Sequence, residues 1–221
     1  MEHFGIKLIN RGKSFRLTRD EFAIVNTKLS LPRFEDLEKR NAYNKEKLNE
    51  YSEVWCSEYR ELCLKNFDLN IEYFAKLDAA EFNKALETFL VKYKQFEEIA
   101  DLKVCAGIEG FYIMVLGDYK QVYIGKAVDI KRRIMQHWTK VKSFDRTLFP
   151  MYAWDKSIFS IDFFRALDTT RIFVWKRNIS DGIEARMIKD FPSQFSTNRV
   201  GGDVTSPIEA LATMKTRCLD K

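Results

Sequence analysis

The spacing of hydrophobic residues changes twice along this chain. Residues 1–30 alternate apolar and charged positions, which is typical of short strands, and residues 10–13 form a turn sequence between the first two apolar runs. We therefore predict a small hairpin there. From about Pro32 to Glu98 the apolar residues recur at steps of three and four, the spacing of helices that bury one face. The two clearest stripes are Leu48, Tyr51, Trp55, Tyr59 and Leu62, and Phe82, Leu86, Phe89, Tyr93 and Phe96.

The alternating pattern of strands returns near residue 110. Residues 111–116 and 121–124 flank the turn-forming pair Gly117-Asp118, which predicts a hairpin. Asp129 suits the N-cap of a following helix. The buried stripe of that helix would be Ile130, Ile134, Trp138 and Val141.

The remaining elements are predicted from local signals. Residues 171–176 predict another strand, and a further helix is expected to begin at Asp181. Ser206 and Glu209 form a capping box with Pro207 at the first helical position, which predicts a last helix. Residues 143–170 are rich in aromatic residues and match no motif, although a short helix could begin at Ser160. This segment either adds to the core or shapes a surface that contacts DNA.

These patterns predict an α+β protein. Residues 1–103 would form a mostly α-helical N-terminal domain, and residues 104–221 a domain with a short, mainly antiparallel central sheet flanked by helices. The 221 residues are 46% hydrophobic and 31% charged, which fits a folded globular chain and not a disordered one. The aromatic helical stripes are interpreted first as core packing and alternatively as a dimerisation seam.

Charge is unevenly distributed between the two regions. Residues 104–221 hold 19 Lys and Arg against 13 Asp and Glu, which gives +6, whereas residues 1–103 hold 18 against 19, which gives −1. A basic surface attracts phosphate backbones. Such an excess also occurs in proteins that bind no nucleic acid, so it supports a nucleic-acid partner only together with other signals.

Cysteine spacing and apolar runs bear on the compartment. The four cysteines lie far apart, with no C-x-x-C pair, so we interpret them as reduced thiols and not as a disulfide frame or a zinc site. No apolar run approaches the length of a membrane span, and the first residues lack the pattern of a signal peptide. We expect a cytoplasmic protein with no membrane partner.

Six residues in the second region carry chemical groups in a recognisable order. Tyr112 and Tyr123 lie in the two strands of the predicted hairpin, and Arg133 and His137 are four residues apart, so they share one helix face. Glu184 and Asn198 follow at the end of the series. From Gly110 to about Asp203 this order resembles the GIY-YIG nucleases, with Phe111 in place of the usual isoleucine.

The resemblance implies a small GIY-YIG-like domain that hydrolyses phosphodiester bonds in DNA. Its catalytic residues would be Tyr112, Tyr123, Arg133, His137 and Glu184. A phenol has an ordinary pKa of about 10, so nearby cations would have to lower that value for a tyrosine to act as a base. Arg133 would neutralise the phosphoryl oxygens, and His137 would hydrogen-bond a tyrosine or the phosphate. Glu184 would bind one Mg²⁺ or Mn²⁺ ion.

The resemblance also implies residues that hold the substrate. Lys126 would be an additional cation, and Arg132 would bind the substrate. Alternatively, Arg132 and Arg133 form a solvated face that is basic by chance. Gly125 would allow close approach to the backbone. Asn198 would either brace the site or contact the backbone of the substrate.

Structural alternatives stand beside these roles. Glu184 lies three residues after Asp181, where a capping-box Glu belongs, and His137 could be a packing histidine next to Trp138. Asn198 could be a turn residue. The functional alternative is a non-catalytic nucleic-acid-binding or adaptor protein that retains the fold. Residues 1–103 would bind a protein partner, form a homodimer or recognise the target.

Overall fold

The centre of the molecule is an antiparallel sheet, and the computed structural model describes residues 1–9, 12–25, 42–46, 50–202 and 206–217. The strand order is β3–β6–β4–β5, and each neighbouring pair is antiparallel. The strands are β3 (Glu97–Ile99), β4 (Gly110–Leu116), β5 (Gln121–Ala127) and β6 (Arg171–Lys176). Together with the helices around this sheet, they confirm the mixed α and β class.

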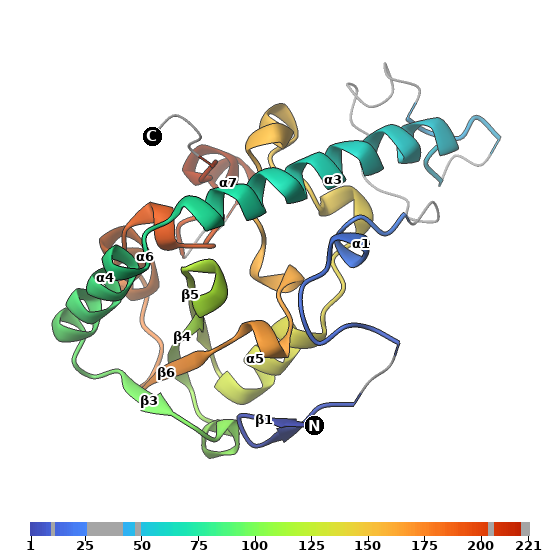
Figure 1. Cartoon of the computed structure of the whole chain (residues 1–221). Coiled ribbons are helices and arrows are strands. Elements are labelled where there is room, and N and C mark those ends of the chain that lie inside the picture. Colours follow the sequence, from blue (N-terminus) through green and yellow to red (C-terminus); the bar gives the residue numbers. More distant parts are fainter. Residues whose placement is uncertain (10–11, 26–41, 47–49, 203–205, 218–221) are drawn as a thin grey trace.

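Alternate side chains of β4 enter two hydrophobic clusters on opposite faces of the sheet. Phe111, Ile113 and Val115 join α4 (Ala79–Lys92) and α6 (Ile183–Asp190). Tyr112, Met114 and Leu116 pack with residues of α5 (Ile130–Thr139) and α3 (Glu53–Lys76). In Figure 1 the strands lie between α4 and α6 on one side and α5 on the other.

The hairpin and the helix that follows it form as predicted. A single 3-10 turn (Gly117–Tyr119) joins β4 to β5, and Lys120 completes the turn with a positive φ of 50°. The Asp129 side chain caps α5 by accepting a hydrogen bond from the backbone N–H of Arg132 at 2.9 Å. Val141 does not belong to the buried stripe, because α5 ends at Thr139 and the Val141 side chain is exposed.

The helical region is shorter than its apolar period indicates. Ser52 caps α3, so Tyr51 precedes the helix, and Leu62 is 39% exposed, contrary to its predicted burial. Leu48 lies outside the described residues. The chain around Glu98 is not helical but forms β3 at the edge of the sheet. The aromatic stripes otherwise pack within the chain, as the core interpretation expects, and a dimer seam remains a prediction.

A small hairpin lies at the N-terminus, but it does not join the two apolar runs that were predicted to pair. Strand β1 (Glu2–His3) pairs with β2 (Ile6–Lys7), and the turn is Phe4-Gly5, both with positive φ. The turn of this hairpin is therefore not the one predicted at residues 10–13, of which Asn10 and Arg11 lie outside the described residues. A short helix, α1 (Arg19–Phe22), follows and packs its phenylalanine into the larger cluster.

The aromatic segment 143–170 is largely a core addition. It consists of short 3-10 turns, and Ser160 caps one of them, as predicted, by accepting from the backbone N–H of Asp162 at 3.4 Å. Asn66 of α3 donates to the carbonyl oxygens of Trp154 and Ser157, both at 3.0 Å. In the described residues, the 3-10 turns besides the one in the hairpin are Leu102–Cys105, Phe144–Arg146, Met151–Lys156, Ile161–Phe163, Ala166–Asp168 and Ser193–Phe195.

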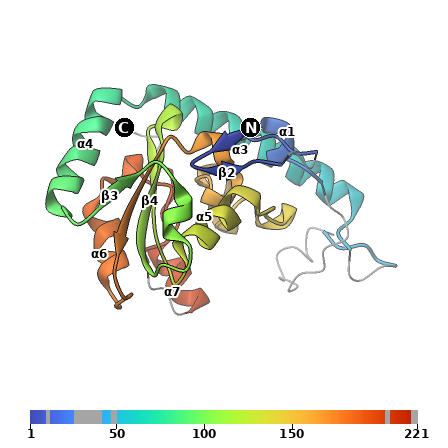
Figure 2. The ribbon, with the colours of Figure 1, turned by 90° about the horizontal axis from the view of Figure 1, so that it is seen from below.

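The two regions on either side of residue 103 share one core. The larger cluster contains Trp55, Tyr59 and Phe74 from α3 together with residues of β4, α5 and the aromatic segment. Figure 2 shows α3 running past the sheet and across toward the segment that precedes β6. Its packing therefore links the predicted N-terminal region to the sheet.

Three smaller expectations concern the ends of the chain and its general class. Helix α7 (Pro207–Thr213) begins as predicted, with the Ser206 hydroxyl accepting from the Glu209 backbone N–H at 3.1 Å. Cys56, Cys63 and Cys105 are buried free thiols, and Cys218 lies outside the described residues. Within the part of the chain that the structure describes, no helix is both long and apolar enough to cross a membrane.

Candidate functional site

The two tyrosines of the predicted site lie on the same face of the sheet. The register of β4 and β5 pairs Tyr112 with Gly125 and Met114 with Tyr123, so the tyrosines are diagonal neighbours. Their ring centroids are 6.1 Å apart. A Cβ atom at Gly125 would lie 2.5 Å from the Tyr112 hydroxyl oxygen. Glycine at this position is therefore what lets the Tyr112 hydroxyl occupy its place.

The Tyr112 hydroxyl begins a chain of buried hydrogen bonds. It lies 2.9 Å from Nε2 of His137, and Nδ1 of His137 lies 2.8 Å from Oδ1 of Asp162. His137 is 2% exposed, and the Tyr123 ring packs against its imidazole at 5.1 Å between centroids. The second carboxylate oxygen of Asp162 lies 3.3 Å from Nζ of Lys140. Tyrosine, histidine and aspartate thus form one continuous polar series inside the protein.

Arg133 supplies the positive charge beside the phenols. Burial raises the pKa of Tyr112 above its ordinary value, and it raises the pKa of Tyr123 to about 12. The Arg133 guanidinium lowers both pKa values against that effect. Tyr112 has no exposed surface, whereas Tyr123 and Arg133 are half-buried. Solvent therefore meets the site at Tyr123 and Arg133.

Burial also keeps the His137 ring neutral. Burial lowers the pKa of His137 below its ordinary value, and Arg133 and Lys140 lower it further. The hydrogen bond that His137 donates to Asp162 opposes this shift without reversing it. The same contact with His137 holds the pKa of the Asp162 carboxyl well below its usual range, against the effect of burial. The pair is thus a neutral imidazole beside an ionised carboxylate.

Glu184 approaches the same region from the first turn of α6. One of its carboxylate oxygens lies 3.8 Å from Nζ of Lys126 on β5, and its side chain is 12% exposed. Burial raises the pKa of Glu184, and the Lys126 cation lowers it. A Cβ atom at Gly202 would lie 2.8 Å from the same oxygen, so the loop after residue 200 packs closely against Glu184.

The start of α6 excludes the capping-box interpretation of Glu184. The N-cap residue is Gly182, in the left-handed conformation, and not Asp181. Glycine supplies no capping side chain, and Glu184 then occupies the second helical position instead of the third. The carboxylate is consequently directed by packing against Lys126 and Gly202 and not by a helix cap.

The residues present fit a hard cation held through one carboxylate. Among the described residues, no three His, Cys, Asp or Glu side chains gather into a metal cage. Mg²⁺ commonly keeps several waters and binds proteins through one or two carboxylates. Glu184 is a desolvated carboxylate with one cation at 3.8 Å, so an ion with its own waters would offset the unfavourable burial of its charge.

Asn198 braces β5. Its Nδ2 donates to the carbonyl oxygen of Ile124 at 2.8 Å, and its Oδ1 accepts from the backbone N–H of Ile124 at 3.0 Å. The residue is 4% exposed. Of its two expected roles, the geometry therefore favours bracing and not contact with a substrate. Asn198 is also more than a turn residue, because its side-chain amide holds Ile124 of β5, which lies 74 residues away in sequence.

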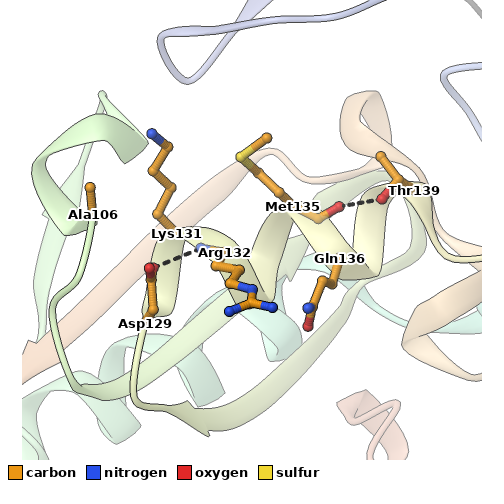
Figure 3. Close-up of a pocket in the computed structure, with 7 residues that line it drawn as sticks. All are labelled: Ala106, Asp129, Lys131, Arg132, Met135, Gln136 and Thr139. Atoms are coloured by element: carbon orange, nitrogen blue, oxygen red, sulfur yellow. Dashed lines mark hydrogen bonds between the residues drawn. The ribbon is translucent and has the colours of Figure 1, made fainter.

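The structure does not bring Arg132 to the tyrosines. Its side chain is exposed and lines a pocket of about 370 Å³ on the outer side of α5, with Lys131 and Gln136 (Figure 3). Consecutive residues of a helix point in directions about 100° apart. Arg133 therefore faces the sheet, whereas Arg132 faces solvent, and a contact of Arg132 with the substrate stays a prediction.

The sequence analysis did not single out Asp162, Lys140 or Lys142, which lie around His137. Asp162 lies in the aromatic segment, and Lys142 donates from Nζ to the Ser160 hydroxyl at 3.2 Å. Burial, with Arg199 nearby, lowers the pKa of Lys142 to about 7. The available signal was a single aspartate between Ile161 and Phe163, because a carboxylate in an apolar run needs a partner if it is buried.

Comparison with known proteins adds no relative to this picture. No protein-family model matches the chain, and no significant match was found among curated proteins or solved structures.

Proposed function

We propose that this protein is a metal-dependent endonuclease that hydrolyses phosphodiester bonds in DNA through a GIY-YIG-type site within residues 104–221. The observation that carries the proposal is the Tyr112–His137 hydrogen bond of 2.9 Å, beside Arg133 and within the same face as Tyr123. Because His137 can accept the Tyr112 proton, the Tyr112 oxygen can take a proton from water. The neighbouring Arg133 guanidinium can neutralise a phosphoryl oxygen.

Tyr112, His137 and Arg133 would each have a separate role in the hydrolysis. As water attacks phosphorus, its proton passes to the Tyr112 oxygen while the Tyr112 proton passes to Nε2 of His137. Arg133 neutralises the charge that develops on the phosphoryl oxygens. Tyr112 has no exposed surface, so substrate binding has to open a path to its hydroxyl past Tyr123. Catalytic hydrogen bonds of this kind commonly tighten only when substrate is bound.

Glu184 would hold the divalent cation, Mg²⁺ or Mn²⁺. When bound, such an ion supplies charge stabilisation to the phosphoryl and leaving oxygens. Lys126, 3.8 Å from Glu184, adds a second positive charge on the side of β5. The excess of Lys and Arg over residues 104–221 supports DNA as the polyanionic partner.

A plasmid assay tests the proposal. Supercoiled DNA is incubated with the full chain in Mg²⁺, in Mn²⁺ and in EDTA, beside Glu184→Ala and the matched control Glu87→Ala. Glu87 is an exposed residue of α4. We expect nicking or linearisation with either metal, none in EDTA, none with Glu184→Ala and full activity with Glu87→Ala.

One result would remove the metal role proposed for Glu184, and another would count against a nuclease. Cleavage by a folded Glu184→Ala protein would remove the metal role from Glu184. Salt-sensitive DNA binding with no cleavage in either metal would favour the alternative, a non-catalytic nucleic-acid-binding protein that retains the fold.

A further inference from the structure

Asp162 contacts the far side of the histidine on which the proposed function depends. We infer that Asp162 is a positioning residue that holds the His137 proton on Nδ1 and so leaves Nε2 bare to accept the Tyr112 proton. The consequence for catalysis rests on the proposed function. The state of the ring does not, and it can be measured independently.

The hydrogen bonds fix the direction of the series. An ionised carboxylate can only accept hydrogen bonds, so the 2.8 Å contact with Oδ1 of Asp162 requires a proton on Nδ1 of His137. A neutral imidazole then has no proton on Nε2. The 2.9 Å contact between Nε2 and the Tyr112 hydroxyl is therefore donated by the phenol. If the proton of the neutral ring were on Nε2 instead, Nδ1 and the Asp162 carboxylate would face each other as two acceptors.

The surroundings hold Asp162 in this role. Asp162 is 7% exposed, and its second carboxylate oxygen lies 3.3 Å from Nζ of Lys140 at the end of α5. Its neighbours Ile161 and Phe163 are buried in the larger core cluster. The carboxylate is thus anchored by packing, with one oxygen for the imidazole and the other for a lysine.

The proton balance of the reaction explains why this matters. The water oxygen forms a bond to phosphorus, the water proton moves to the Tyr112 oxygen, and the Tyr112 proton moves to Nε2. The bond from phosphorus to the leaving oxygen breaks, and that oxygen takes a proton from solvent. His137 is transiently an imidazolium, which the Asp162 carboxylate stabilises before the extra proton returns to solvent.

The chain contains a natural internal comparison. His3 and His137 are its two histidines. Nε2 of His3 lies 2.8 Å from the carbonyl oxygen of Thr169, so this nitrogen has to carry the proton. The two rings are therefore expected in opposite tautomers. Nitrogen-15 NMR distinguishes the tautomers through the chemical shifts of the protonated and bare ring nitrogens.

The first experiment is a nitrogen-15 spectrum of the full chain with labelled histidine near neutral pH, with His3→Gln for assignment. We expect His137 with the proton on Nδ1. A wild-type His137 with its proton on Nε2 would overturn the inference, and this measurement needs no substitution at Asp162.

The second experiment uses Asp162→Asn. Because Lys140 prefers an oxygen, the new amide should turn its oxygen to Lys140 and its N–H groups to the imidazole, which moves the His137 proton to Nε2. Asp168→Asn is the matched control, since Asp168 is also buried but accepts from the backbone of Leu17 and Arg165. An unchanged His137 tautomer in Asp162→Asn would contradict the inference.

Plasmid nicking separates the two proposals. Asp162→Asn should slow cleavage by roughly 10²–10⁴-fold, the range of general-base contributions, while Asp168→Asn retains the rate. If the tautomer moves and cleavage stays at the wild-type rate, the proton position that Asp162 sets plays no part in cleavage, although the nuclease assignment stands. If the wild type never cleaves, the proposed function fails, and the tautomer result stands by itself.

Discussion

At the scale of single residues, Arg132 and Arg133 of α5 differ in the direction of their side chains. Arg133 lies beside the phenols and lowers their pKa values, whereas Arg132 is exposed on the outer side of α5. The two residues are identical in charge and differ only by one step along the helix. They therefore form a matched pair for separating a role at the reacting phosphate from general attraction to DNA.

Arg133→Ala should lose about 3–4 kcal/mol of transition-state stabilisation, in keeping with the loss of one preorganised donor. Arg132→Ala should change the cleavage rate far less and act mainly through salt-dependent DNA binding. Single-turnover nicking at saturating protein measures the first effect, and binding titrations at two salt concentrations measure the second. Equal losses of cleavage in both variants would contradict this division between the two arginines.

A glycine controls the position of the Tyr112 hydroxyl. Gly125→Ala would place a methyl group 2.5 Å from that oxygen, so the phenol has to move away from His137. We expect loss of cleavage and a decrease of about 1–3 kcal/mol in the free energy of unfolding, the usual effect of overpacking. Gly201→Ala is the control, because its Cβ would meet nothing within 4 Å. A fully active Gly125→Ala protein would show that the close approach is irrelevant.

At the scale of elements, the two helices of the site begin in different ways. Asp129 caps α5 with its side chain, as the sequence predicts. Helix α6 starts after Gly182, and the aspartate before it does not act as the cap. Both starts have an aspartate in sequence, so the local signal is the same. The difference arises because a glycine in the left-handed conformation takes the N-cap position of α6.

The two aspartates should therefore differ in stability effect. Asp129→Ala removes a capping hydrogen bond and should lower the free energy of unfolding by about 1 kcal/mol. Asp181→Ala should change it by less than about 0.5 kcal/mol, as expected for an exposed residue outside such features. Urea unfolding followed by circular dichroism measures both. A larger loss for Asp181→Ala than for Asp129→Ala would contradict this account of the helix starts.

At the scale of the whole molecule, the hydrophobic core extends across the boundary near residue 103 that charge and periodicity suggest. Helices α3 and α4 come from residues before 103, yet they cover the sheet built largely from residues after it. The edge strand β3 of that sheet also comes from before residue 103. Asn66 and Asn70 of α3 both donate to the carbonyl oxygen of Ser157 at 3.0 Å. The helical region thus buries both faces of the sheet and anchors the aromatic segment.

The full chain should consequently unfold in one cooperative transition, and residues 104–221 alone should not fold stably. That fragment would expose the apolar residues that α3 and α4 cover, a loss of core that small domains rarely tolerate. Calorimetry of the full chain, with circular dichroism of the fragment, measures this. Two separate transitions, or a well-folded fragment, would establish residues 1–103 as an independent domain.

The sequence by itself determined the elements whose signals are local. The hairpin around Gly117, the Asp129 and Ser206 caps, and the strand at residues 171–176 all follow from nearby turn, capping and alternation signals. The same local order put the two tyrosines, Arg133 and His137 on adjoining elements. These features could be predicted because a hydrogen bond or a side-chain period within a few residues decides each of them.

Only the tertiary structure decided which groups meet. Asp162 reaches His137 from 25 residues away through a segment without a motif, and Asn198 fixes β5 from 74 residues away. Leu62 keeps an apolar period yet stays exposed, because burial depends on what packs opposite and not on the stripe itself. Long-range contacts of this kind depend on how the whole chain closes its core, which no local window of sequence records.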